Sequence, residues 1–279
     1  MSSNSIETVS GAPSSTTVVA EGLDLPAGMF RSGKDVQNGF ITQPRRNIGI
    51  LNHNAKYTVV KDLDSEVALF EGDIVLGTPE EVRQAVNEGR GIGIKGENFR
   101  WPDGIVPFVV QDSLIPRVQA AIQHWMERTP FKFVPRVDQN DFISFERREG
   151  CWSRVGRQGG KQVISLGSGC GIGAAIHEIG HALGLYHEQS RSDRDNFIEV
   201  IMENVDPDFA HNFDKHIQDA NDLGTYDHGS IMHYPATAFS INGLPTIRVK
   251  GGQPIGQRNG LSAGDVAAMK MMYKNLAWP

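Results

Sequence analysis

The chain has 279 residues, of which 39% are hydrophobic and 22% are charged, and its formal net charge is -6. This composition is that of an ordinary globular protein with enough apolar residues for a core. It shows no apolar run of 18 residues, so we expect no membrane-spanning helix. It also shows no long run of Lys or Arg, which nucleic-acid binding usually needs, so we expect no nucleic-acid partner.

The first third of the chain divides into two parts. Residues 1–35 are rich in Ser, Thr and Gly and are predicted to form a flexible tail, with no signal peptide visible in them. Residues 36–92 contain strand-like runs at 57–60 and 67–70 and a helix that begins at Pro79, with Thr78 as its cap. The glycines at 89, 91 and 93 then predict an exposed joint.

Residues 93–279 have the pattern of one compact domain that mixes helices and strands. Strands are predicted at 105–110, 131–134, 142–145 and 163–166, and helices at 116–128 and 171–183. In the first of these helices Val118, Ile122, Trp125 and Met126 share a face. A last helix follows Ser262, where an aspartate three residues later resembles a capping box.

Residues 177–187 predict a zinc site. His177 and His181 are four residues apart, so on a helix they lie on one face and can bind one tetrahedral zinc. Glu178, next to the first ligand, suits the general base that takes the proton of zinc-bound water. Gly184 can end the helix in the left-handed conformation and return His187 to the metal. Three protein ligands leave one position open, which is typical of a catalytic zinc.

A His-Glu-x-x-His pattern also arises by chance on ordinary amphipathic helices. Here Gly184 and His187 extend it at the spacing of the metzincin peptidases, which argues against core histidines. A turn at 230–235 follows about 50 residues downstream, as in the same proteins. We therefore expect Met232 to lie beneath the zinc as a polarisable apolar floor.

The chain resembles the astacins, a branch of the metzincins, over roughly residues 100–275. The resemblance is carried by Glu188 directly after the third histidine, by 189–195, by the turn at 230–234, by 255–258 and by Leu261, Ser262 and Asp265. It implies a two-lobed α+β catalytic domain at 93–279. A twisted, mostly parallel sheet and helices would lie above a cleft, and an irregular lobe with a C-terminal helix below it. The implied activity is endopeptidase hydrolysis with one Zn²⁺.

The resemblance also implies roles for single residues. Tyr234 would stabilise the oxyanion, and Arg258 would favour Asp or Glu just after the cleaved bond. Glu188 would meet the new N-terminus after activation. Cys151 and Cys170 match one of two disulfides usual in the family, and the second pair is absent. By themselves, these cysteines fit either two separate thiols or one bridge.

Residues 70–73, Phe-Glu-Gly-Asp, resemble the prosegment motif of the same family. Asp73 would then occupy the open zinc position in a latent proenzyme, with residues 36–92 as the prosegment and the glycine joint as the region of activation cleavage. The alternative is an acidic turn that only reverses the chain.

The expected partners are protein or peptide substrates, and the expected state is a monomer. A secreted or extracytoplasmic location is favoured by the bridge and the prosegment, although no leader is visible. The alternative function is a catalytically inactive, zinc-stabilised binding module. A zinc-loaded, processed protein that cleaved no peptide would favour that alternative.

Overall fold

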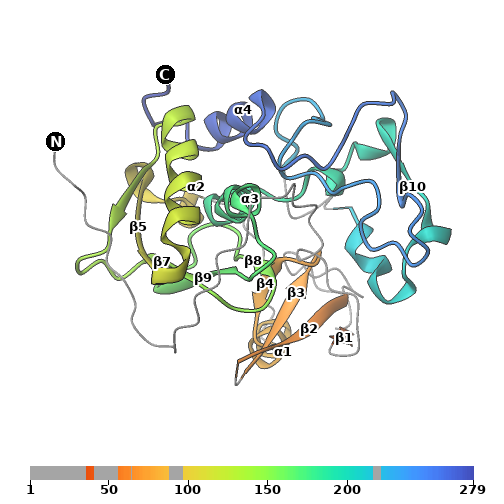
Figure 1. The fold of residues 1–279 in the computed structure, drawn as a ribbon, viewed down its shortest axis with the longest axis horizontal. Coiled ribbons are helices and arrows are strands. Elements are labelled where there is room, and N and C mark those ends of the chain that lie inside the picture. Colours follow the sequence, from red (N-terminus) through yellow and green to blue (C-terminus); the bar gives the residue numbers. More distant parts are fainter. Residues whose placement is uncertain (1–35, 41–55, 64, 88–96, 216–220) are drawn as a thin grey trace.

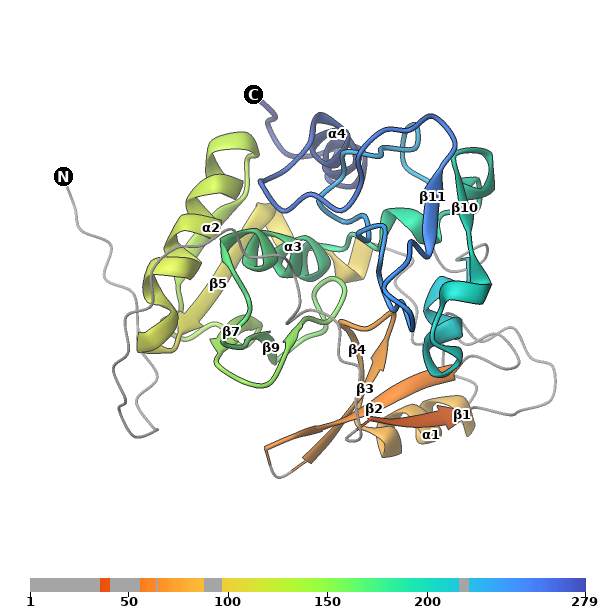
Figure 2. The same cartoon turned by 45° about the vertical axis from the view of Figure 1, so that its right-hand side comes forward.

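The computed structural model describes residues 36–40, 56–63, 65–87, 97–215 and 221–279 (Figures 1 and 2). The predicted tail at 1–35 and the glycine joint after residue 88 lie outside the described residues. Within the described ranges, no helix has both the length and the apolar character needed to cross a bilayer.

One half of the molecule is built on a five-stranded sheet, in the order β6-β5-β7-β9-β8. The first four strands run parallel and β8 pairs antiparallel with β9, so the expected mostly parallel sheet is confirmed. The strands are β5 (Ile105–Val110), β6 (Lys132–Pro135), β7 (Phe142–Glu146), β8 (Cys151–Trp152) and β9 (Lys161–Leu166). Two helices accompany the sheet, α2 (Ile115–Arg128) and α3 (Ile172–Leu183).

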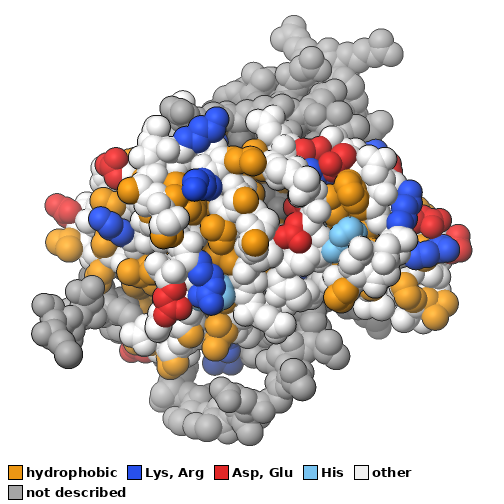
Figure 3. Space-filling view, turned by 90° about the horizontal axis from the view of Figure 1, so that it is seen from above, with side chains coloured by type: hydrophobic (Ala, Val, Ile, Leu, Met, Phe, Trp, Pro, Cys, Tyr) orange, Lys and Arg blue, Asp and Glu red, His pale blue; other side chains and the backbone are white. Residues whose placement is uncertain are grey.

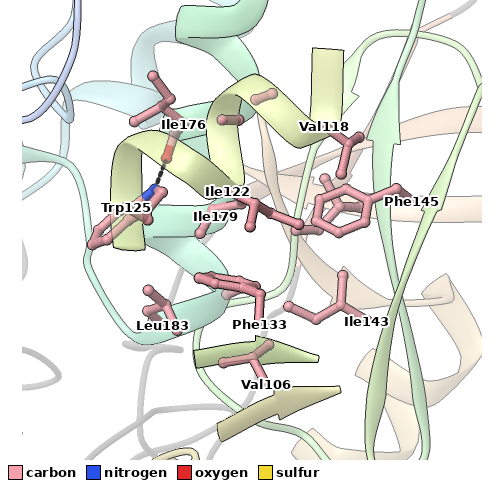
Figure 4. Close-up of a cluster of buried hydrophobic side chains, with 14 of the residues drawn as sticks. Val106, Val118, Ile122, Trp125, Phe133, Ile143, Phe145, Ile176, Ile179 and Leu183 are labelled. Carbon is pink, nitrogen blue, oxygen red and sulfur yellow. Dashed lines mark hydrogen bonds between the residues drawn. The ribbon is translucent and has the colours of Figure 1, made fainter. Parts of the chain in front are cut away.

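The main core lies where α2 and α3 pack against each other and against the sheet (Figure 4). The Trp125 indole donates a hydrogen bond to the Ile176 carbonyl at 3.0 Å, which joins the two helices. Met126 was predicted on the buried face of α2, and this was wrong, because its side chain is 47% exposed. One residue turns a helix by about 100°, which carries Met126 past the edge defined by Trp125.

The other half of the molecule is mostly irregular, as the resemblance implied (Figure 1). It contains a two-stranded antiparallel pair, β10 (Ile198–Val200) and β11 (Ile247–Val249). Helix α4 (Ala263–Met272) begins at the predicted capping box, in which Ser262 and Asp265 exchange hydrogen bonds. Short 3₁₀ helices lie in both halves, at Glu97–Phe99, Pro102–Gly104, Asp112–Leu114, Glu188–Ser190, Arg194–Asn196, Met202–Asn204 and Pro207–Phe213.

The N-terminal segment forms its own antiparallel sheet, in the order β1-β2-β3-β4, followed by α1 (Pro79–Asn87). The strands are β1 (Val36–Phe40), β2 (Lys56–Asp62), β3 (Ser65–Phe70) and β4 (Ile74–Gly77). Thr78 caps α1 as predicted, because its hydroxyl accepts from the Glu81 N–H at 3.1 Å.

This N-terminal sheet lies beneath α3, between the two halves of the molecule (Figures 1 and 2). Its last strand runs parallel along the edge of the five-stranded sheet. The Val75 N–H donates to the Ser153 carbonyl at 2.8 Å, and the Ser153 N–H donates to the Asp73 carbonyl at 2.9 Å. The N-terminal segment therefore occupies an edge to which an extended peptide could otherwise bind.

We expect Ile179→Ala to lower the free energy of unfolding by about 2–5 kcal/mol, because Ile179 is fully buried in the core of Figure 4. Ile172→Ala is the matched control, since it makes the same change in the same helix at a side chain that is 47% exposed. Denaturant unfolding of both variants checks this. Equal losses would show that the buried side chain of Ile179 contributes no more to stability than the exposed side chain of Ile172.

Candidate metal centre

The end of α3 brings three histidines together. His177 and His181 lie one turn apart and are fully buried. Gly184 follows with φ 114°, in the predicted left-handed conformation. Its N–H donates to the His181 carbonyl at 2.8 Å, and the next N–H, of Leu185, donates to the Gly180 carbonyl at 3.0 Å. This helix ending turns the chain back, so that His187 reaches the same site.

Hydrogen bonds fix the orientation of each imidazole. Nδ1 of His177 lies 2.8 Å from the Ile231 carbonyl oxygen, and Nδ1 of His181 lies 2.8 Å from the Leu185 carbonyl oxygen. A carbonyl can only accept, so both Nδ1 atoms carry the proton and both neutral rings present an Nε2 lone pair. The third ring has a carboxylate partner instead, because Nδ1 of His187 lies 2.8 Å from Oε2 of Glu71.

The three Nε2 atoms surround the carboxylate of Asp73. Its oxygens lie 3.3 Å from Nε2 of His177, 3.6 Å from that of His181 and 3.2 Å from that of His187. Nε2 of His177 and Nε2 of His187 are themselves 3.3 Å apart. One ligand atom from each of the four residues fits within 4.8 Å of the others.

These spacings fit a tetrahedral zinc ion. Zinc bonds of about 2.0–2.1 Å separate neighbouring ligand atoms by about 3.3 Å. Among the described residues, Nε2 of His181 and Oδ1 of Asp73 are buried without a hydrogen-bond partner. Such orphaned atoms are costly unless something binds them, and a metal ion among the four groups would satisfy both.

The pKa values of two buried carboxyl groups in the site, Glu178 and Asp73, are shifted in opposite directions. Burial raises the pKa of Glu178 well above its usual value, and the charge of Asp73 raises it further. Burial acts in the same direction on Asp73, but the charge of His187 beside it holds its pKa well below the usual value. Both oxygens of Glu178 lack a hydrogen-bond partner in the described part of the chain. Opposite shifts of this kind mark groups suited to different acid–base roles.

The predicted methionine turn lies under the zinc helix. A Cβ added to Gly180 would lie 2.8 Å from Sδ of Met232, so the turn and the helix pack closely here. Asp265, at the start of α4, holds the turn by accepting from the Ser230 hydroxyl at 2.6 Å and from the Ile231 N–H at 3.0 Å. The capping box of the last helix therefore also positions the carbonyl that orients His177.

Tyr234 reaches the site from the same turn. Its ring centroid lies 4.7 Å from that of His187, and its hydroxyl donates to the Glu71 carbonyl at 2.5 Å. The Tyr234 N–H donates to Oε1 of Gln189 at 3.0 Å. Sequence reasoning missed Glu71 and Gln189, because nothing in their local pattern indicates contacts so distant along the chain.

Arg258 is brought near the site by a close passage of the chain. A Cβ on Gly173 would lie 1.8 Å from the Arg258 carbonyl oxygen, so only glycine fits at the start of α3. One guanidinium nitrogen donates to the His233 carbonyl at 3.0 Å, while Nε and the other terminal nitrogen are buried without partners in the described chain. Burial lowers the pKa of Arg258 to about 10, against the opposing charges of Asp73 and Glu178.

Glu188 and the two cysteines lie outside the metal-binding group. Oε1 of Glu188 accepts from the Asp227 N–H at 2.8 Å, and burial raises the pKa of this carboxyl to about 7. Glu188 also lines a cavity of about 110 Å³ beside Arg191. Cys151 and Cys170 form a disulfide, with 5.9 Å between their Cα atoms. The bridge joins β8 to a residue two positions before the start of α3.

This fold and this group of histidines define a zinc metalloendopeptidase domain. Residues 93–274 match the family model described as Astacin (Peptidase family M12A), and the chain belongs to the astacin family. The mostly parallel sheet implied by the resemblance and the histidine triad predicted from the spacing of residues 177–187 are both confirmed.

Several relatives and one solved structure agree with this assignment. The chain is 37% identical over 238 residues to Protein SpAN of Strongylocentrotus purpuratus, a match that covers 77% of this chain and 39% of that protein. High choriolytic enzyme 2 of Oryzias latipes is 40% identical over 183 residues, covering 61% of this chain and 63% of that protein. The structure of high choriolytic enzyme 1, a hatching enzyme zinc-protease from the same fish, superposes with a TM-score of 0.61 at 37% identity. That likeness covers 66% of this chain and 100% of the other.

The chain thus spans about two fifths of the length of Protein SpAN, and a similar share, 38%, of Blastula protease 10 from Paracentrotus lividus.

Proposed function

We propose that this chain is a latent zinc endopeptidase, in which residues 36–92 are a prosegment that blocks the catalytic domain at 93–279. The observation that carries the proposal is the position of Asp73, whose carboxylate lies 3.2–3.6 Å from the Nε2 atoms of His177, His181 and His187. A carboxylate at the fourth position of the zinc keeps out the water that the reaction needs.

In the catalytic step we assign the proton transfers to Glu178. Zinc, when bound, lowers the pKa of a water towards neutrality and polarises a carbonyl. Glu178 then takes the proton of the attacking water and passes it to the leaving amine. Its raised pKa and its unpartnered oxygens support this role. The Tyr234 hydroxyl, once released from Glu71, stabilises the developing oxyanion.

Substrate peptides would bind in extended form along β8, where residues 73–75 now pair with Ser153. Arg258 would receive an Asp or Glu side chain just after the cleaved bond, since part of its guanidinium has no partner in the described chain. On the face drawn in Figure 3, basic and acidic side chains are interspersed, unlike the basic patch of a polyanion-binding surface.

Activation would follow cleavage near the glycine joint, and the new N-terminus would then pair with Glu188. The cavity that Glu188 lines, and the raised pKa of its carboxyl group, support the pairing. Every residue of the site comes from one chain, so a monomer suffices. The disulfide favours an oxidising, extracytoplasmic location.

We expect Glu178→Gln to keep its zinc but to lose about 10²–10⁴-fold in kcat/KM, because the general base is removed. The assay uses a quenched peptide after limited proteolysis near residue 90, with a chelator as a blank. Glu203→Gln, at an exposed acid, is the control. Normal cleavage by Glu178→Gln would refute its role. A zinc-loaded, processed wild type that cleaved no peptide would favour the inactive binding module.

The uncut chain should gain activity when the turn at Asp73 is disturbed. Gly72 has φ +84°, and an added Cβ would lie 2.7 Å from Cζ of Phe239, so Gly72→Ala strains the turn that carries Asp73. Gly243→Ala is the matched control, since Gly243 also has positive φ but no atom within 4 Å of the added Cβ. We expect several-fold higher activity for Gly72→Ala and Asp73→Asn, with mass spectrometry to show that the chain is uncut. If the uncut variants are no more active than the uncut wild type, Asp73 does not have the proposed latency role.

Arg258→Gln should lower kcat/KM about 10-fold for a peptide with Asp after the cleaved bond, while a matched Ala peptide changes little, because only the acidic side chain loses a partner. Arg248→Gln, at an exposed arginine, is the control. Equal losses on both peptides would assign Arg258 a structural role instead.

A further inference from the structure

We propose that Glu71 is a second latency residue, which acts on His187 and Tyr234 instead of filling the open metal position. The inference rests on the proposed latency and extends it, because it separates two functions within the turn at 70–73. Asp73 covers the metal. Glu71 would hold one metal ligand and the tyrosine of the catalytic domain in their resting positions.

The contacts of Glu71 are divided between its side chain and its backbone. Oε2 lies 2.8 Å from Nδ1 of His187, and Oε1 accepts from the Ser190 hydroxyl. The Glu71 carbonyl accepts from the Tyr234 hydroxyl at 2.5 Å. Glu71 and Tyr234 are both fully buried, so no bulk water competes for these hydrogen bonds.

The backbone of Glu71 supports the same conclusion. Its φ is +50°, a left-handed conformation that glycine or asparagine adopts more easily than glutamate. Disfavoured conformations of this kind persist where surrounding contacts hold them, and they gather at functional sites. Polar groups of His187, Ser190 and Tyr234 are among the contacts that hold Glu71 in this conformation.

The partner of His187 differs in kind from those of the other two rings. His177 and His181 donate to carbonyl groups of the catalytic domain itself. His187 pairs with a carboxylate from the segment that activation removes. A carboxylate behind a ligating imidazole fixes the ring and raises its basicity, which strengthens the hold on the metal. The uncut chain should therefore lose some of its hold on zinc when Glu71 is changed, whether or not Asp73 is present.

The experiment measures zinc retention by the full-length, uncut, zinc-loaded chain mixed with excess chelator. We expect Glu71→Gln to retain zinc about 10- to 100-fold less well than wild type, as is usual when such a partner is lost. Glu66→Gln, at an exposed acid in β3, is the matched control and should behave as wild type. The visible spectrum of the cobalt(II)-substituted uncut chain should also shift in Glu71→Gln, which a merely structural role would not cause.

Removal of the prosegment supplies a second control. After cleavage, Glu71→Gln and wild type become the same molecule, so both must release zinc and cleave peptide at equal rates. Zinc retention within twofold of wild type in uncut Glu71→Gln would overturn the inference. If Glu71→Gln does not fold, Glu71→Asp keeps the charge but withdraws the carboxylate by one methylene, and unchanged retention in it would overturn the inference equally.

The failure of this inference is distinguishable from that of the proposed function. If processed wild type cleaves peptide but uncut Glu71→Gln retains zinc normally, the role of Glu71 fails and the peptidase stands. If zinc retention falls as expected but processed wild type cleaves nothing, Glu71 still supports the metal site and the peptidase activity fails.

Discussion

The structure depends on a group of four side chains whose ligand atoms lie close enough together to bind one metal ion, and which is shut away from water. Three imidazoles and one carboxylate, all fully buried, share a space small enough for one ion. Buried polar groups of this kind persist only when each has a partner. Helix α3 supplies two of the rings, the turn at Gly184 returns the third, and the N-terminal segment supplies the carboxylate. The capping of α4 acts on the same group at a distance, through Asp265 and Ile231.

The zinc helix and its ending could be predicted because their signals are local. Histidines four residues apart share a helix face whatever surrounds them, and Gly184 takes the left-handed conformation that the sequence predicted. The caps at Thr78 and Ser262 were found for the same reason. Met126 was misplaced because a periodic pattern gives the centre of a buried face more reliably than its edge.

Contacts between segments that are far apart in the chain could not be predicted from the sequence. Glu71 and His187 are 116 positions apart, and no property of either residue alone indicates that they meet. The order of the sheet was equally hidden, since its edge strand β8 has only two residues and carries no periodicity of its own. The likeness to a family supplied roles for Tyr234 and Arg258. It did not supply the hydrogen bond from Tyr234 to Glu71 of the N-terminal segment, or the one from Arg258 to the His233 carbonyl.

The N-terminal sheet covers the site with apolar contacts as well as with its two carboxylates. Leu69 and Val75 belong to a buried cluster with Trp152, and Phe70 and Ile74 belong to another with Val155. Arg148 of the catalytic half pairs with Asp62 on the same surface. Removal of the segment would expose Trp152 next to the sheet edge, and an apolar surface beside a free strand edge is well suited to hold an extended peptide.

The Cys151–Cys170 bridge ties the strand that would hold the substrate to the helix that holds two of the metal ligands. Neither cysteine belongs to the metal-binding group, so reduction of the bridge would leave the ligand side chains chemically unchanged. It would nevertheless free the peptide-binding edge to move independently of the reacting centre. The thiol–disulfide balance of the surroundings would therefore act as a second condition on the peptidase, separate from the proposed removal of the N-terminal segment. In a reducing compartment, a processed molecule would keep its catalytic side chains, but the bound peptide would no longer be held in a fixed position relative to the metal site.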